Sequence, residues 1–514
     1  MALARSSVTV GGYTLASRVL GFVRDVLIAG LLGAGPVAEA FVVAFRIPNL
    51  FRRLVGEGAF TAAFVPLFAR TVEERGRDEA ARFGNQALAF LTGSLLVFTL
   101  AAELLMPWLI LGLAPGFADD PQRFDLTVAF TRITFPYLPC MAAVALLGGM
   151  LNVVYRFAAM AAAPIALNIV LIGALLIGDA WGAPGESLVW GVAVAGLVQV
   201  AWLVFSATRA ELRVVLVWPR LTPEIKRLLV LMVPGLIAGG VTQINIVIGT
   251  LLATLAGDGA VAFLYYADRV YQLPLGVVGI AIGTALLPLL ARQRRRGDAA
   301  AAAASLNRAL EFTALLVLPA TIALLAVPHA IVTVLFERGA FTAADSAATA
   351  WALAAYAAGL PAFVLVRVLA TGFFADEDTR APLRAALWAV IVNIALSVAL
   401  MAPLGHVGIA LATSLAGWVN AGLLGLRLRR AGQLAIGHQL LARVARIGVA
   451  AITMGVALGA AASVWPVAEA GPTGRIALLA ALVAAGFVVY AVAVLLVHGT
   501  SVAELRSHFA DRSA

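Results

Sequence analysis

The sequence predicts an all-α integral membrane protein with fourteen transmembrane helices: two six-helix lobes in a parallel pseudo-two-fold repeat, plus two extra C-terminal helices. Composition, the number of membrane-length segments and an internal repeat lead to this prediction. The chain has 514 residues, 62% of them hydrophobic and only 12% charged. A soluble protein is about half apolar and about a quarter charged. This chain therefore has more apolar surface than a water-soluble core can bury, and we expect lipid to be its solvent.

Fourteen segments are long and apolar enough to cross a bilayer, which takes about 20 helical residues. They cover residues 6–33, 37–68, 85–113, 126–154, 158–178, 187–208, 224–256, 260–290, 308–336, 346–375, 382–402, 406–427, 443–465 and 475–498. The first lacks a cleavage site and is expected to be an uncleaved span. The first, second, seventh and eighth are the least regular, as is tolerated where backbone lines a cavity.

Basic residues set the expected orientation. With the N-terminus inside, 25 of the 36 Lys and Arg residues fall on inner loops and tails, eight lie within spans, and three lie on outer loops (Arg123, Arg338 and Arg475). This bias is a strong positive-inside signal. An even number of spans then places both termini in the cytoplasm.

A repeat divides the chain. The segment AFVPLFAR at 63–70 returns as ALLPLLAR at 285–292, an offset of 285 − 63 = 222 residues. Each copy ends a span before a basic inner loop, so the two halves are expected to share topology. We expect an N-lobe at 1–208, a C-lobe at 209–430, and helices 13 and 14 with a cytoplasmic tail at 431–514. Two six-helix lobes around a cavity are typical of a transporter.

Charged residues within the spans are the candidate functional residues. Each costs about 2.5–3.5 kcal/mol at bilayer depth, so it persists where it faces a wet cavity or a partner. In the first span, Arg18 and Asp25 are seven residues apart, as are Ser17 and Arg24, and the two pairs form one polar stripe. Glycines in the same span lower helix stability and allow the bending that a gate needs.

The second and eighth spans carry further charges. Glu39 shares a helix face with Arg46, and Arg53 forms an i,i+4 pair with Glu57, next to Arg52. The eighth span places Asp268 beside Arg269. Cations exceed anions in the spans, which favours a phosphate-bearing ligand gripped by guanidinium groups. For each arginine the alternative is a structural ion pair or a snorkelling side chain, which we favour for Arg46, Arg132 and Arg367.

Several other classes are disfavoured. The five histidines lack metal-site spacing, and no Walker A loop or polar catalytic loop occurs in the sequence. Basic residues are spread over short loops rather than one face, which argues against nucleic acid. Cys140 is the single cysteine and is expected to be a small buried side chain. We therefore expect no metal, no cofactor and no enzymatic activity.

Three long motifs resemble the MurJ/MviN family of lipid II flippases, within the multidrug/oligosaccharidyl-lipid/polysaccharide exporter superfamily. They are SRVLGFVRD (17–25), FRIPNLFRRLVGEGAFTAAFVPLF (45–68) and YYADRVYQLPLGVVGIAIGTALLP (265–288). The resemblance covers essentially the whole chain, including the expected span count.

The resemblance implies movement of lipid II, an undecaprenyl-pyrophosphate disaccharide-pentapeptide, from the cytoplasmic to the periplasmic leaflet of the bacterial inner membrane. It implies substrate-binding roles for Arg18, Arg24, Arg52 and Arg269, and a lipid-tail groove on helices 13 and 14. Expected supporting or gating residues are Ser17, Asp25, Glu39, Arg53, Glu57 and Asp268. Membrane lipids are expected partners, and cell-wall synthesis and division proteins are candidate partners.

Some relatives look sodium-coupled, but this chain has Gly249 and Ser397 where acidic residues would be expected, although Asn393 is kept. Membrane potential or protons are therefore the favoured drivers. Two alternatives stay open: export of another polyprenyl-linked glycan or a drug, and, from another class, a membrane glycan polymerase or transferase. The second would use the outer acidic loop at 116–125.

Overall fold

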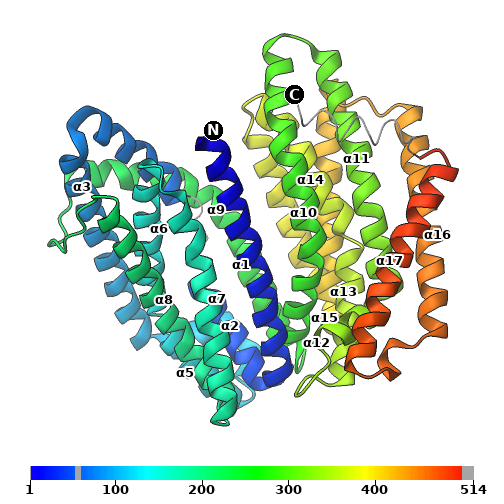
Figure 1. The fold of residues 1–514 in the computed structure, drawn as a ribbon, viewed down its shortest axis with the longest axis horizontal. Helices are drawn as coiled ribbons and strands as arrows, with labels where there is room; N and C mark the ends of the chain where they lie inside the picture. The colour runs from blue at the N-terminus through cyan, green and yellow to red at the C-terminus, as the bar shows by residue number, and fades with distance from the viewer. Residues whose placement is uncertain (1, 52–58, 500–514) are drawn as a thin grey trace. The chain divides into compact units, whose positions relative to one another are not determined.

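The computed structural model describes residues 2–51 and 59–499, with side-chain environments for all of these except 2–8, 51, 59, 237–238, 241–242, 277–285 and 468. Every regular element in these ranges is a helix, which confirms the predicted all-α class. The chain forms two compact units (Figure 1). The first is Met1–Ala262 with Arg338–Phe341, and the second is Phe263–Glu337 with Thr342–Ala514. The division into lobes at 1–208 and 209–430 stays a prediction.

The first unit is built from nine α-helices and one short 3-10 helix in the described residues. They are α1 (Ala2–Leu32), α2 (Pro36–Phe51), α3 (Ala59–Leu104), α4 (Met106–Leu113), η2 (Pro115–Phe117), α5 (Pro121–Thr134), α6 (Tyr137–Val153), α7 (Phe157–Ala180), α8 (Pro184–Arg209) and α9 (Pro223–Leu255). α6 is buried along nearly its whole length. α3, α7 and α8 pack around it, while α1 lies along α7 and α2 against α5.

The second unit contains the remaining helices. They are α10 (Ala260–Arg295), which starts in the first unit, α11 (Ala299–Ala326), α12 (Pro328–Phe336), α13 (Ala343–Ala357), α14 (Leu360–Ala375), α15 (Arg380–Arg430), α16 (His438–Val464), η3 (Val467–Glu469) and α17 (Pro472–Leu496). α16 packs on α11 and α17, so the last two long helices form a layer on α11 and α12.

Two elements are helical hairpins. Gly76 interrupts α3 with φ 83° and ψ 174°, and Gly405 interrupts α15 with φ 56° and ψ −135°. A straight helix would separate the rings of Phe64 and Phe83 by about 28 Å at 1.5 Å per residue, yet their centroids are 5.6 Å apart. α3 therefore reverses at Gly76, where a positive φ favours glycine because it has no Cβ.

In the described part of the chain, nine helices are long and apolar enough to cross a membrane. They fall on the third to sixth and ninth to fourteenth predicted spans, α15 covering two of these. The first, second, seventh and eighth predicted spans correspond to α1, to α2 with the start of α3, to α9 and to α10. These are the spans that charges, glycine or proline interrupt. The count of fourteen spans stays a prediction.

Candidate functional site

The polar stripe of α1 is organised around Arg24. Its Nε and Nη2 donate to Oδ1 of Asp25 at 3.0 and 2.7 Å, and its Nη1 donates to Oδ1 of Asn168 at 2.9 Å. Both charged residues are buried, Arg24 being 8% and Asp25 3% exposed. An ion pair removed from water needs such additional hydrogen bonds to offset the loss of hydration. Arg24 is therefore fixed in a position that its neighbours define.

Asn168 comes from α7 and joins two turns of α1. While its oxygen accepts from Arg24, its Nδ2 donates to the carbonyl oxygen of Ser17 at 2.9 Å. Ser17 and Arg24 thus lie on one face, as their seven-residue spacing indicates. Arg18, which follows Ser17 in α1, is exposed.

α2 carries two charges that contact residues far along the chain. The guanidinium of Arg46 donates to the hydroxyl of Thr250 in α9. Glu39, one turn from the start of α2, accepts from the backbone N–H of Val261 at 3.0 Å. Arg46 thereby acts as a contact between helices, and Glu39 satisfies an N–H at the first turn of α10.

The charges of α10 have local partners. The guanidinium of Arg269 lies over the Tyr265 ring, 4.6 Å from its centroid, a cation–π geometry. Asp268 accepts from the side-chain amide of Gln272 one turn later. Both charged residues are half-buried.

The structure describes only some of the arginines that the resemblance implies for substrate binding. Arg52, Arg53 and Glu57 lie outside the described residues. Arg18 and Arg24 belong to the first unit and Arg269 to the second. Their convergence on one ligand stays a prediction.

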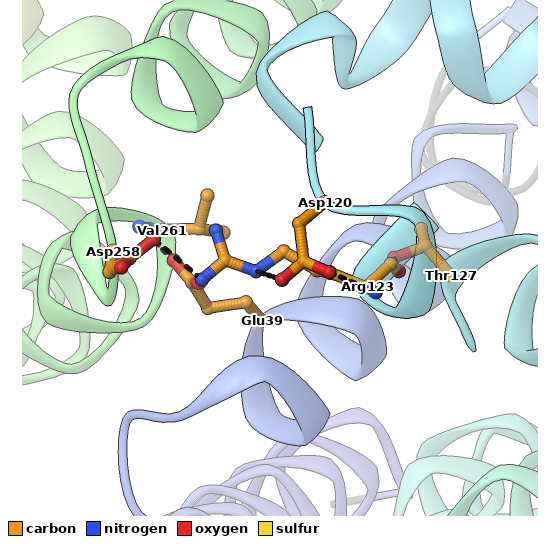
Figure 2. Close-up of polar contacts among 6 residues, drawn as sticks. All are labelled: Glu39, Asp120, Arg123, Thr127, Asp258 and Val261. Carbon is orange, nitrogen blue, oxygen red and sulfur yellow. Dashed lines mark hydrogen bonds and ion pairs between the residues drawn. The ribbon is translucent and has the colours of Figure 1, made fainter. Parts of the chain in front are cut away.

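A second polar cluster surrounds Arg123 on α5 (Figure 2). It comprises Glu39, Asp120, Arg123, Asp258 and Val261, and we call it the outer cluster because the sequence predicts that Arg123 lies on the outer side. Nη2 of Arg123 lies 2.8 Å from Oδ1 of Asp258 and 3.4 Å from Oε2 of Glu39. The Cζ atom of Arg123 lies over the Phe117 ring, 5.1 Å from its centroid. The Glu39 side chain is 0% exposed and that of Asp258 is 92% exposed. Arg123 therefore neutralises one carboxylate in a dry environment and one in water, and it links α2, α5 and the α9–α10 connection.

Close backbone contacts also occur at the C-terminal ends of α1 and α9. The N–H of Ala340 donates to the carbonyl oxygen of Gly30 at 2.7 Å, and a Cβ on Gly33, which has φ +65°, would lie 2.5 Å from the oxygen of Ala340. Likewise, a Cβ on Gly116 would lie 2.0 Å from the oxygen of Thr254. Only glycine fits such approaches. One loop thus docks on the end of α1, and another on the end of α9.

Sequence reasoning missed two members of these clusters. Asn168 is a single polar residue in an apolar span, which was the available signal. Arg123 was counted as an outer-loop cation, yet it is 6% exposed and belongs to α5. The rarity of cations on the expected outer side was the signal in that case.

Comparison with known proteins identifies the family of this chain. A family model described as "Lipid II flippase MurJ" matches residues 28–469. The chain belongs to this family. Among MurJ relatives, a "Probable lipid II flippase MurJ" of Rhizobium meliloti (strain 1021) is 47% identical over 514 residues, covering 98% of this chain and 96% of the relative. The "Lipid II flippase MurJ" of Burkholderia cenocepacia is 35% identical, covering 94% of this chain and 95% of the relative.

Solved structures show the same fold. A MurJ structure described as being in an inward closed conformation matches with a TM-score of 0.79 at 24% identity, covering 95% of this chain and 98% of that chain. An inward-facing multidrug resistance MATE transporter matches with a TM-score of 0.69 at 14% identity, covering 83% of this chain and 98% of the transporter. The fold is therefore that of MurJ and MATE transporters, and the chain is a multi-pass membrane protein.

Proposed function

We propose that this chain flips lipid II from the cytoplasmic to the periplasmic leaflet of the bacterial inner membrane by alternating access. The observation that carries the proposal is membership of the MurJ family over residues 28–469. Two relatives that cover nearly the whole chain carry names that include this activity. In the proposed topology both termini are cytoplasmic and fourteen helices form two six-helix lobes plus a C-terminal pair that holds the lipid tail.

The chemistry of α1 supports an anionic cargo. The buried pair of Arg24 and Asp25 is electrically neutral at rest, which lowers the cost of keeping a guanidinium away from water. A diphosphate entering the cavity supplies anionic oxygens that compete with the Asp25 carboxylate for the same N–H groups. The diphosphate would also be bound by Arg18, Arg52 and Arg269. The supporting residues would be Ser17, Arg53, Glu57 and Asp268.

The outer cluster supports a gate at the periplasmic side. Arg123 and Glu39 come from the first predicted lobe, and Asp258 and Val261 come from the second. In the proposed cycle these contacts hold the periplasmic side closed while cargo enters from the cytoplasm, and they separate when it leaves. Bending of α1 at its glycines would accompany the change.

The two docked loops support the parallel repeat. An offset of 222 residues maps the contact of Gly116 with Thr254 onto positions 338 and 32. The observed contacts of Gly339 and Ala340 with Gly30 and Gly33 lie within two residues of these positions. The same offset separates Glu39 from Val261, which bond to each other.

Growth of flippase-depleted cells tests the proposal. Arg24→Ala and Arg269→Ala variants, expressed at normal levels, should fail to support growth, while Arg70→Ala, which removes an exposed arginine outside the site, should support it. Full growth with both site variants would contradict the proposal. The precursor that accumulates on depletion separates lipid II from another polyprenyl-linked glycan or a drug as cargo. Polymer formation from labelled lipid II by the purified protein would indicate a polymerase instead.

A further inference from the structure

The segment that joins α8 to α9, residues 210–222 (the connector), displays large apolar side chains. From residue 212 to 222 it is neither helix nor strand. Leu216 is 101% exposed and Trp218 is 81% exposed, while Val215 and Leu221 are each more than half exposed. Four exposed large apolar side chains within seven residues concentrate apolar surface in one short segment, and such a concentration marks an interaction site.

The connector is held in place rather than loose. Asn85 of α3 donates to the carbonyl oxygen of Arg213 at 2.8 Å and accepts from the N–H of Val215 at 3.1 Å. Gln86 donates to the carbonyl oxygens of Trp218 and Arg220 at 3.2 and 3.0 Å. These bonds fix the backbone on both sides of Leu216, so its exposure is a property of the fold.

Two solvent-exposed ion pairs lie at the ends of the connector. Nη1 of Arg75 lies 3.6 Å from Oε1 of Glu224, and Nη1 of Arg77 lies 3.6 Å from Oε2 of Glu211. Residues beside the α3 reversal therefore contact both ends of the connector. The two acidic residues near the connector are thereby paired. The basic residues Arg213 and Arg220 are exposed within it, and Lys226 and Arg227 are exposed just after it.

The connector runs beside the part of α3 that is apolar enough to cross a membrane. Pro219 lies 3.7 Å from the point where a Cβ on Gly93 would be. Gly93 is eight residues beyond Asn85, about 12 Å along the helix, within a helix apolar enough to cross a membrane. The neighbouring Trp218 and Leu216 are therefore at the level of the first turns of a membrane span.

We propose that the connector is an interfacial anchor in the leaflet on the side of the basic loops. Leu216 and Trp218 enter the boundary between headgroups and acyl chains, while Arg213 and Arg220 bind the phosphates of anionic lipids. Tryptophan is favoured at this depth because its ring is apolar and its N–H is polar, and arginine extends its charge to the headgroups. This anchoring is independent of the cargo that the protein moves.

Spin-label depth measurements in vesicles test the insertion. In full-length protein with Cys140→Ala, which removes the single thiol, a label is attached at Leu216→Cys. Collisions with oxygen, which enters lipid, are compared with collisions with a nickel chelate, which stays in water. Reference labels are Val97→Cys, exposed on α3, and Asp78→Cys, exposed beside the α3 reversal.

The label at residue 216 should show a ratio of oxygen to nickel collisions well above that at 78 but below that at 97, because it lies at the boundary between headgroups and acyl chains rather than deep in the span. A nickel accessibility equal to that at residue 78 would overturn the proposal and leave this surface for a partner in water.

Brominated lipids test the charge preference. A fluorophore at residue 216 should be quenched more by brominated phosphatidylglycerol than by brominated phosphatidylcholine at equal mole fraction, with about fivefold local enrichment for each arginine near the surface. Arg213→Gln with Arg220→Gln should remove the difference, because the clamp from Asn85 and Gln86 uses only backbone atoms of these residues. Equal quenching by both lipids in the parent protein would refute the role of the arginines.

Discussion

Replacing Arg123 with Gln should release the proposed periplasmic gate. The shorter contact of Arg123 is with Asp258, at 2.8 Å, and the longer is with Glu39, at 3.4 Å. Exposure to solvent, rather than distance, nevertheless decides how much each ion pair contributes to the free energy of the closed state. The Asp258 side chain is 92% exposed and that of Glu39 is 0% exposed. An exposed pair contributes about 0–1 kcal/mol, whereas removing one partner of a buried pair costs about 3–5 kcal/mol.

The expected shift follows from these magnitudes. We assume that Glu39 is hydrated again when the periplasmic side opens. Destabilising the closed state by about 3 kcal/mol then raises the ratio of open to closed molecules by about 150-fold. Asp258→Asn should change it by less than about fivefold.

The assay is labelling of a buried cysteine by a membrane-impermeant maleimide from the periplasmic side. Ala38→Cys in the Cys140→Ala background provides the probe, because Ala38 is 0% exposed and adjacent to Glu39. Arg123→Gln should accelerate labelling, and Arg123→Gln with Glu39→Gln should return it close to the parent rate, since removing both charges leaves none buried and unpaired. An unchanged labelling rate in Arg123→Gln would show that Arg123 does not hold the periplasmic side closed.

Three further predictions concern α1 and its contacts. Asn168→Ala removes the bonds to Ser17 and Arg24 and should lower stability by about 2 kcal/mol, seen as a lower melting temperature in detergent; an unchanged value would contradict the contact. Gly33→Ala should lower the melting temperature because of the 2.5 Å approach and the φ of +65°, whereas Gly35→Ala, with nothing within 4 Å, should not. Arg24→Lys keeps the charge but loses the planar fork, so it should fail to support growth; normal growth would exclude bidentate recognition.

Helical periodicity predicted part of this arrangement. It placed Ser17 with Arg24 on one face, and the structure joins them through Asn168. Periodicity carries no information about the partner helix, so Asn168 could not be named from spacing. The preferred structural role of Arg46 agrees with its bond to Thr250, 204 residues away.

Long-range burial explains what the sequence did not reveal. Arg123 looked like a solvated loop cation because its buried partner, Glu39, lies 84 residues earlier in the chain. The close docking of Gly116 on Thr254 likewise depends on tertiary packing, which a single glycine does not signal. By contrast, the reversals at Gly76 and Gly405 fall between predicted spans, within a charged segment at Gly76 and at a short Pro-Leu-Gly break at Gly405.

An experimental density map of the full-length protein in lipid nanodiscs with bound lipid II would show directly whether Arg24 and Arg269 bind the same headgroup. We expect pyrophosphate density within about 3 Å of the guanidinium groups of both Arg24 and Arg269, the distance of a charge-assisted hydrogen bond. A map in which the headgroup lies elsewhere, with Arg24 still bonded to Asp25 and Arg269 still on Tyr265, would contradict it.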